Sequence, residues 1–303
     1  MTALRLATRR SALALAQAGG VAATLIAAFG RDVELVEITT AGDVSTSAIE
    51  QIGGTGVFVT ALRDAVLAGD VDLAVHSYKD LPTAAAPGLA IAAVPPRADP
   101  RDVLCCPAGR TLGELPSGAR IGTGSPRRAA QLRALGLGLE IVPIRGNVDT
   151  RLKKAIDGEV DAVVLAHAGL QRLDRLDAVT EVLDPIQLLP APAQGALALE
   201  CRSDDAVLLE LLAELDDPVS RATVDAERAV LAALEAGCTA PVGALADVAD
   251  DELYLRAAVC APDGSDVMRR SAMGPLTDPH VLGRALASEL LDDGAAELMR
   301  VLS

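Results

Sequence analysis

Aromatic side chains are almost missing from this chain. Tryptophan is absent, and two phenylalanines and two tyrosines are the whole aromatic content of 303 residues. Since hydrophobic residues still make up 50% of the chain, its core must be built from aliphatic side chains. Proteins that bind single-stranded nucleic acid stack the bases on aromatic rings, so the composition argues against that class of function.

Positive charge is also scarce. Lys and Arg total 27 against 42 Asp and Glu, and the resulting formal net charge of -15 argues against a general polyanion binder. Lysine occurs only at Lys79, Lys153 and Lys154. We therefore expect no nucleic-acid partner, and the places where arginines gather become informative.

Cysteine is infrequent and lacks a paired spacing. The chain contains no CxxC motif, and its five cysteines are Cys105, Cys106, Cys201, Cys238 and Cys260. An odd number without such a spacing indicates neither a disulfide framework nor a zinc site, so we expect no metal. These cysteines suit the reducing cytoplasm.

The longest uncharged run lies near the N-terminus. Thr8-Arg9-Arg10, followed by the uncharged residues 11–30, imitates a twin-arginine signal peptide. The run is rich in alanine and interrupted by polar residues such as Gln17 and Thr24, which makes it a poor membrane span. Its larger apolar residues have helical spacing after Ser11, a good N-cap. We interpret it as a helix of the folded protein, with a signal peptide as the alternative, and expect no membrane partner and a cytoplasmic location.

An internal repeat organises the first two-thirds of the chain. Three segments recur in the same order, because residues 5–11, 33–38 and 69–75 resemble residues 120–125, 139–144 and 158–164. Alternating helices and strands of this kind predict two similar α/β lobes, with mostly parallel sheets and helices on both faces. In such lobes, ligands bind beyond the carboxyl ends of the strands.

The pattern changes after the second lobe. Prolines gather in residues 95–107 and 185–192, which indicates two crossings between the lobes. From residue 220 onward we expect a small α+β domain. Its predicted elements are a helix over 220–235, a strand over 252–260, a turn at 262–264 and a final helix over 278–301.

The segment Gly122-Thr123-Gly124-Ser125-Pro126-Arg127-Arg128 ends a strand and opens a helix. Ser125 suits the N-cap and Pro126 the first helical position, so unpaired backbone N–H groups would face a ligand there. The planar fork of arginine binds both oxygens of a carboxylate, so two adjacent arginines favour an anion site over a solvated helix end. We expect Arg127 and Arg128 to bind a ligand, and their replacement to change stability little.

Residues 145–151 repeat this arrangement after the next strand. Arg145 is followed by Gly146, which permits close approach of a ligand to the backbone. Arg151 falls in the first helical turn, where a cation opposes the helix dipole unless an anion is bound. Two such segments indicate a ligand with several carboxylates.

The segment His76-Ser77-Tyr78-Lys79-Asp80 follows a predicted buried strand. Asp80 could stabilise a cation that develops during a reaction, or it could simply pair with Lys79 in a loop salt bridge. His76 at a strand end is more often structural than catalytic, and no Ser-His-Asp order supports hydrolysis. Cys238 stands in a glycine-containing loop, where a buried, inert thiol is the usual alternative to a reactive one.

Taken together, these segments resemble the hydroxymethylbilane synthase, or porphobilinogen deaminase, family. The match runs nearly end to end and comprises Thr8-Arg9 with Ser11, His76 to Asp80, Gly122 to Ser125 with Arg127-Arg128, Arg145-Gly146-Asn147 with Arg151, Ala168-Gly169-Leu170 with Arg172, Gln194-Gly195-Ala196, Glu227-Arg228, and Gly237-Cys238. The resemblance implies two lobes like those of type II periplasmic binding proteins, and a small α+β domain that carries the cofactor cysteine. The implied boundaries are 1–95 plus 191–215, 99–189, and 218–303.

The resemblance also implies a transferase reaction of haem and tetrapyrrole biosynthesis. Four porphobilinogen molecules are joined head to tail, with release of ammonia, to give the linear tetrapyrrole hydroxymethylbilane. A dipyrromethane cofactor, held by a thioether to Cys238, primes the chain. The implied catalytic residues are Asp80 and Lys79, in a protein expected to be monomeric.

The resemblance assigns the remaining motif residues to ligand binding. Besides Cys238, the implied cofactor-binding residues are Lys79, Asp80, Thr123, Ser125, Arg127, Arg128, Arg145, Gly146 and Arg151. The implied substrate-binding residues are Arg9, Ser11, Arg145, Arg151, Arg172 and Gln194. These basic residues would give an acidic protein a locally positive cleft for a substrate with several carboxylates.

Some positions depart from the pattern of the family. Gln51 and Thr55 stand where lysine is frequent, and Ala41 stands where a basic residue is frequent, which removes positive charge from an expected lid. Two alternatives remain open. A binding module for small carboxylates would need neither Cys238 nor the third domain, whereas a paralogue with low turnover would keep the cofactor.

Overall fold

The computed structural model describes residues 3–39, 59–236 and 240–300. The chain divides into two compact units, Met1–Arg97 with Ala196–Arg221 and Ala98–Gly195 with Ala222–Ser303. The expected lid positions Ala41, Gln51 and Thr55, and the expected cofactor cysteine Cys238, lie outside the described residues. The three-domain boundaries drawn from the sequence stay a prediction.

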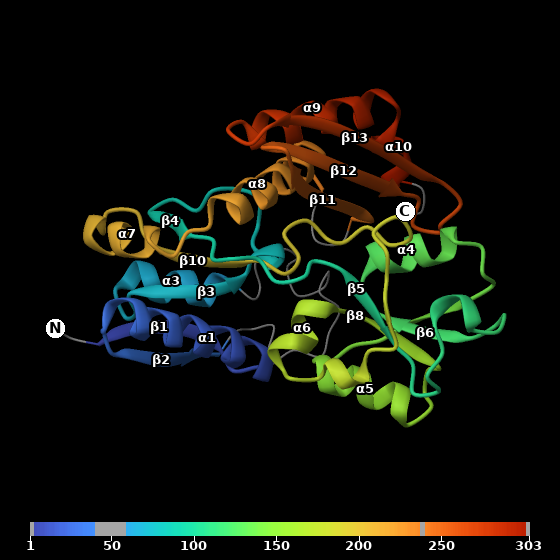
Figure 1. The fold of residues 1–303 in the computed structure, drawn as a ribbon, viewed down its shortest axis with the longest axis horizontal. Helices are drawn as coiled ribbons and strands as arrows, with labels where there is room; N and C mark the ends of the chain where they lie inside the picture. The colour runs from blue at the N-terminus through green and yellow to red at the C-terminus, as the bar shows by residue number, and fades with distance from the viewer. Residues whose placement is uncertain (1–2, 40–58, 237–239, 301–303) are drawn as a thin grey trace. The chain divides into compact units, whose positions relative to one another are not determined.

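The first unit is built on a five-stranded sheet with strand order β2-β1-β3-β10-β4 (Figure 1). Its strands are β1 (Leu4–Arg9), β2 (Val33–Ile38), β3 (Leu73–Ser77), β4 (Leu89–Ala93) and β10 (Leu197–Arg202). β1 pairs in parallel with β2 and β3, whereas β10 runs antiparallel to β3 and β4. The helices are α1 (Ala12–Phe29), α3 (Thr60–Ala68), the one-turn helix η2 (Tyr78–Asp80) and α7 (Ala206–Ala213).

Helix α1 is a core element of the first unit, as the sequence predicts. The hydroxyl of Ser11 caps it by accepting the N–H of Ala14 at 3.3 Å. By length and composition the helix could cross a membrane. In the structure, however, its residues Val21 and Leu25 are buried in the same hydrophobic cluster as Leu6 of β1. The N-terminal segment is therefore part of the packed lobe.

The second unit contains a sheet of the same design, with strand order β7-β6-β8-β5-β9. Its strands are β5 (Asp102–Cys105), β6 (Arg120–Thr123), β7 (Glu140–Pro143), β8 (Ala162–Ala166) and β9 (Glu181–Val182). β6 is parallel to β7 and β8, and β5 is antiparallel to β8 and β9. The associated helices are η3 (Leu112–Glu114), α4 (Pro126–Ala134), α5 (Val148–Ile156), α6 (His167–Arg172) and η4 (Leu176–Ala178).

The two lobes repeat one another down to a side-chain contact. The backbone N–H of Arg5 donates to Asp72 at 2.7 Å, and its guanidinium donates to the carbonyls of the turn before β3. The N–H of Arg120 donates to Asp161 at 2.7 Å, and its guanidinium reaches the matching turn before β8. The internal repeat, and with it the prediction of two similar α/β lobes, is confirmed. Each sheet is mixed, however, because two of its strand pairings are parallel and two are antiparallel.

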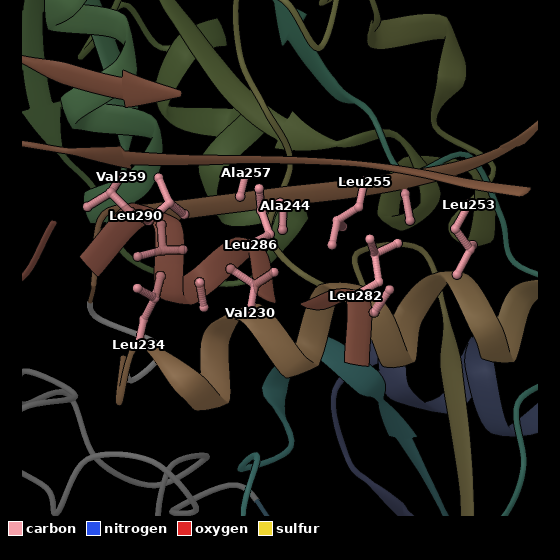
Figure 2. Packing of buried hydrophobic residues seen from close by; sticks show 14 of the residues in the cluster. Val230, Leu234, Ala244, Leu253, Leu255, Ala257, Val259, Leu282, Leu286 and Leu290 are labelled. Carbon is pink, nitrogen blue, oxygen red and sulfur yellow. The ribbon is translucent and has the colours of Figure 1, made fainter. Parts of the chain in front are cut away.

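A third, antiparallel sheet with strand order β11-β12-β13 belongs to the second unit. It consists of β11 (Val242–Ala249), β12 (Glu252–Cys260) and β13 (Val267–Pro275), accompanied by α8 (Pro218–Ala233), α9 (Pro279–Asp292) and α10 (Ala295–Arg300). Figure 2 shows Val230, Leu282, Leu286 and Leu290 of the helices pointing toward Leu255 and its neighbours on the sheet. This core is entirely aliphatic, as the composition requires.

The third sheet packs against the second lobe within this unit. Leu189 of the lobe forms a hydrophobic cluster with Leu245 and Ala258 of the sheet. The N–H of Ala244 donates to the carbonyl of Pro190 at 3.0 Å, and the guanidinium of Arg133 donates to the carbonyl of Pro262 at 2.8 Å. Helix α4 and the third sheet are therefore held in one compact body.

The prediction of a single final helix is wrong. The segment contains α9 and α10, which are separated at Gly294. The φ of Gly294 is 98°, a left-handed conformation that glycine adopts without strain and that ends a helix. The apolar spacing continues across this break, so periodicity alone could not locate it.

The sheet–helix core predicts a stability difference between two leucines of α9. Leu286 is 0% exposed, whereas Leu291 is 38% exposed. We expect Leu286→Ala to lower the free energy of unfolding by about 2–5 kcal/mol, since it leaves a cavity. Leu291→Ala should change it by about 0.5 kcal/mol or less. Urea unfolding of both variants measures the difference, and equal losses would contradict this account of the core.

Candidate functional site

Helix α4 begins where β6 ends, with the cap that the sequence predicts. The hydroxyl of Thr123 accepts the N–H of Ser125 at 3.2 Å, and the hydroxyl of Ser125 accepts the N–H of Arg128 at 3.4 Å. A Cβ on Gly124 would stand 2.6 Å from the carbonyl oxygen of Ile144, so only glycine fits there. The turn is thus held against the end of β7, and its remaining N–H groups mark the positive end of the helix dipole.

Helix α5 begins in the same way. Asn147 caps it by accepting the N–H of Thr150 at 2.8 Å. Gly146 has a φ of 109°, and a Cβ there would stand 2.6 Å from the side chain of Thr150. The Nε of Arg151 donates to the carbonyl of Gly146 at 2.8 Å. The guanidinium is therefore directed back toward the start of its own helix.

The two helix starts lie side by side. An Nη atom of Arg151 is 4.0 Å from the position that a Cβ on Gly124 would occupy. Arg145, at the end of the strand before α5, is exposed. The structure therefore gathers Thr123, Ser125, Arg145 and Arg151 around two capped helix N-termini, an arrangement suited to carboxylates.

Arg127 and Arg128 have an internal partner that the sequence analysis did not identify. Both are buried, at 4% and 5% exposure, and both donate to Asp102, which is 0% exposed. An Nη atom of Arg127 lies 2.8 Å from one oxygen, and an Nη atom of Arg128 lies 2.7 Å from the other. Burial alone would raise the pKa of Asp102, but the two guanidiniums outweigh it and hold that pKa well below its ordinary value.

This ion cluster overturns one expectation. Removal of Arg127 or Arg128 would leave Asp102 with an uncompensated buried charge, so their replacement must affect stability. The guanidiniums also donate to the carbonyls of Leu189 and Val164, at 2.6 and 3.0 Å. One polar atom remains: the Nε of Arg127 is buried and has no hydrogen-bond partner among the described residues.

Gln194 and Arg172 support the backbone of the same unit. The side-chain amide of Gln194 donates to Asp102 and to the carbonyl of Pro100, both at 2.7 Å. The guanidinium of Arg172 donates to the carbonyl of Gly195 at 2.6 Å, and burial lowers the pKa of Arg172. These contacts attach residues 194–195, just before β10, to the second lobe. The expected role of Gln194 and Arg172 in substrate binding stays a prediction.

The first unit carries the remaining predicted residues. Arg9 ends β1, Ser11 caps α1, and Lys79 and Asp80 lie in η2 directly after β3. Arg9 and Lys79 are half-buried, whereas Asp80 is exposed. His76 is buried, with its Nε2 at 3.1 Å from Glu200, as expected for a structural histidine. The turn after β3 therefore presents an exposed carboxylate at the end of a buried strand.

Four cysteines fall within the described residues, and all four are buried free thiols. Burial raises the pKa of Cys105 to about 12 and the pKa values of Cys201 and Cys260 to about 11. Such thiols stay protonated at neutral pH and are poor nucleophiles. Within residues 3–39, 59–236 and 240–300, no group of three or more His, Cys, Asp or Glu side chains could hold a metal ion.

The buried ion cluster predicts a large, pH-dependent effect at Asp102. Because the pKa of Asp102 is depressed in the folded state, its contribution is present above the unfolded value of about 3.9 and is lost as the pH falls toward the folded-state value. We expect Asp102→Asn to lower the free energy of unfolding by about 3–5 kcal/mol at neutral pH. Asp99→Asn, which breaks the exposed pair with Arg101, should lower it by less than about 1 kcal/mol.

Urea unfolding between neutral and acidic pH measures both variants. The difference between Asp102→Asn and the unsubstituted protein should shrink as the pH falls. A difference that stays constant with pH would contradict the assignment of the stabilisation to an ionised Asp102.

Two family models cover most of the chain. The model "Porphobilinogen deaminase, dipyromethane cofactor binding domain" matches residues 4–210, and "Porphobilinogen deaminase, C-terminal domain" matches residues 221–292. Among solved structures, the methionine-binding protein MetQ is similar over 70% of this chain and 89% of its own, with a TM-score of 0.46 and 13% identity.

Curated relatives are similar over almost the whole length. A porphobilinogen deaminase of Nocardia farcinica is 60% identical over 98% of this chain and 88% of its own. One from Mycobacterium bovis is 58% identical over 98% of both chains, and porphobilinogen deaminase 1 of Streptomyces coelicolor is 58% identical over 98% of this chain and 97% of its own. The family models and the curated relatives both show that this chain belongs to the porphobilinogen deaminase family.

Proposed function

We propose that this chain performs the reaction of its family with the carboxylate-binding helix starts of its second unit and the exposed Asp80 of its first. The family is that of hydroxymethylbilane synthase, a transferase that joins four porphobilinogen molecules head to tail with release of ammonia. The observation that carries the assignment of residues is the side-by-side placement of the helix starts of α4 and α5, with Arg151 against Gly124.

The second unit offers the chemistry that a dipyrromethane cofactor requires. This group carries several acetate and propionate carboxylates, which match backbone N–H groups, hydroxyls and guanidiniums. Thr123, Ser125, Arg145 and Arg151 supply these groups, and Gly146 leaves the backbone accessible. Arg127 and Arg128 share the single negative charge of Asp102, so the cluster keeps a net positive charge for a bound carboxylate.

We assign the covalent attachment of the cofactor to Cys238. A thiolate is the nucleophilic form of cysteine, and the four described cysteines are buried, with raised pKa values at Cys105, Cys201 and Cys260. Cys238 stands between α8 and β11, in the family's Gly-Cys motif. When bound, the dipyrromethane supplies the pyrrole to which substrate units are added.

Asp80 is the proposed catalytic carboxylate. Loss of ammonia leaves a positive charge on porphobilinogen, and an adjacent carboxylate stabilises this charge as it develops. Lys79 stands beside Asp80 in the same turn and is assigned to the carboxylates of substrate and cofactor. Arg9, Ser11, Arg172 and Gln194 are assigned to substrate, in line with the family motifs that they match.

We further infer a cytoplasmic monomer that uses neither nucleic acid nor membrane. Helix α1 and β1 share the hydrophobic core of the first unit, so cleavage of this segment as a signal peptide would remove part of that core. A binding module for small carboxylates is the alternative function. Such a module needs no covalent cofactor, so the mass of the purified protein distinguishes the two.

The intact mass tests the attachment. We expect the purified protein to exceed its sequence mass by one dipyrromethane, and Cys238→Ser to abolish the increment together with turnover. Cys260→Ser is the matched control, because its thiol is buried, and it should retain both the mass increment and the turnover. An active protein at the bare sequence mass would contradict the assignment.

The charge of Asp80 separates catalysis from binding. Asp80→Asn keeps the size of the side chain but removes the charge that stabilises the transition state. We expect ammonia release to fall by about a hundred- to a thousandfold, with a modest change in porphobilinogen affinity. Asp80→Glu should retain measurable activity, because the charge survives at a displaced position.

Single-turnover ammonia release from cofactor-loaded protein is the measurement. The side chain of Asp80 is exposed, so neither substitution should change thermal unfolding appreciably. Ammonia release by Asp80→Asn at the unsubstituted rate would remove Asp80 from the mechanism.

A further inference from the structure

A buried ionic cluster includes His76, in the strand that leads into Asp80. Glu200 of β10 has a side chain only 2% exposed. Arg63 donates to both of its oxygens, from Nη at 2.8 Å and from Nε at 3.0 Å, and the Nε2 of His76 lies 3.1 Å from Oε2. Burial opposes ionisation of Glu200, but the neighbouring His76 side chain and the hydrogen-bonded guanidinium of Arg63 outweigh it and lower the pKa of Glu200.

The sheet register brings these residues together. β10 is antiparallel to β3, with Ala198 opposite His76 and Glu200 opposite Ala74. Because side chains alternate along a strand, Glu200 and His76 share one face as diagonal neighbours. Helix α3, which carries Arg63, covers this face through its buried residues Leu62 and Val66. The ionic cluster therefore lies inside the apolar contact between α3 and the sheet.

The opposite face of the strand end is also held. Gln17 of α1 is buried, and its side-chain amide donates to the hydroxyl of Ser77 at 2.8 Å. The hydroxyl of Ser77 also lies 3.2 Å from the side-chain amide oxygen of Gln17. His76 and Ser77, the last two residues of β3, are thus fixed on the two faces of the sheet.

The chain beyond β3 is anchored on each side of the exposed carboxylate. Tyr78 is buried and donates its N–H to the carbonyl of Ala196 at 3.1 Å. Leu81 is buried and donates its N–H to the carbonyl of Tyr78 at 3.2 Å. Between these two anchors stand Lys79 and Asp80. The direction of Asp80 is therefore determined by the strand end from which the turn starts.

We propose that Glu200 is a positioning residue which, through Arg63 and His76, fixes the end of β3 and thereby the carboxylate of Asp80. A buried carboxylate that loses its partners is strongly disfavoured, so the cluster resists displacement of either the strand or α3. Electrostatic catalysis depends on such fixed geometry, since a shift of about 1 Å can reduce a rate a hundredfold. The proposal rests on the catalytic role of Asp80 proposed above.

The test is a double-mutant cycle on cofactor-loaded protein. Glu200→Gln removes the negative charge that lies beside Arg63 and His76. The end of β3 should therefore loosen, while the substrate-binding side chains stay in place. We expect kcat for ammonia release to fall by about ten- to a hundredfold and KM to stay within about twofold. In the Asp80→Asn background, Glu200→Gln should cause almost no further loss, because the residue acts through Asp80.

A matched control separates positioning from simple loss of stability. Asp72→Asn breaks the Arg5–Asp72 pair, which joins β1 to the turn at the other end of β3. We expect it to lower the unfolding temperature while kcat stays within about twofold. Intact mass should show the same cofactor occupancy in Asp72→Asn and Glu200→Gln. Arg63→Lys keeps the positive charge but loses the contact of Arg63 with both carboxylate oxygens of Glu200. We therefore expect it to lower kcat by less than Glu200→Gln does. If Glu200→Gln does not fold, Arg63→Lys tests the positioning role in its place.

The outcomes separate this proposal from the one on which it rests. If Glu200→Gln causes the same loss in the unsubstituted protein and in the Asp80→Asn variant, the positioning role is overturned and the catalytic role of Asp80 stays intact. A loss of kcat in Asp72→Asn that matches its loss of stability would also overturn the positioning role. If Asp80→Asn alone leaves ammonia release unchanged, the role of Asp80 fails first and the positioning role fails with it.

Discussion

A carboxylate buried between two guanidiniums organises the second unit. Asp102 is the first residue of β5, Arg127 and Arg128 lie in the first turn of α4, and Gln194 lies in the segment before β10, so one ionised group joins three parts of the chain. Each of these charges would be strongly disfavoured alone in the interior, so none of the three parts can shift without breaking the cluster. The start of α4 is therefore fixed before any ligand arrives, and the cluster still carries one positive charge in excess.

The first unit meets the same constraint at the equivalent strand. β10 and β5 both occupy the fourth position of their sheets, and both run against their neighbours. Each carries a buried acid, Glu200 or Asp102, that pairs with arginine from a helix on the same lobe. Each acid stands on the first strand after the chain passes from one unit to the other, at Ala98 before β5 and at Ala196 before β10. In both lobes the returning strand is thus tied to its helix layer by a charge as well as by the ladder of backbone hydrogen bonds.

Much of the fold could be predicted from the sequence because its signals are local. Several features are each encoded within a few residues: the repeated turns before β3 and β8, the helix caps at Ser11 and Ser125, and Pro126 at the start of α4. The ionic clusters could not be predicted in this way, since Glu200 lies 137 positions from Arg63 and Asp102 lies 25 from Arg127. A signal did exist, because an acid within an otherwise apolar buried strand requires a partner. Identification of that partner requires the order of the strands.

The charge balance of the chain follows from the same pairing. A formal charge of -15 would repel a substrate with several carboxylates if charge were spread evenly. Yet many arginines are neutralised by nearby acids, as Arg5 is by Asp72, so most of the positive charge is used inside the fold. In the function proposed above, an anion is attracted by the local excess of positive charge at the starts of α4 and α5, where guanidiniums and helix N-termini coincide. Since exposed charges more than about 10 Å away are screened at ordinary ionic strength, this local excess outweighs the acidic surface at the distances where carboxylates bind.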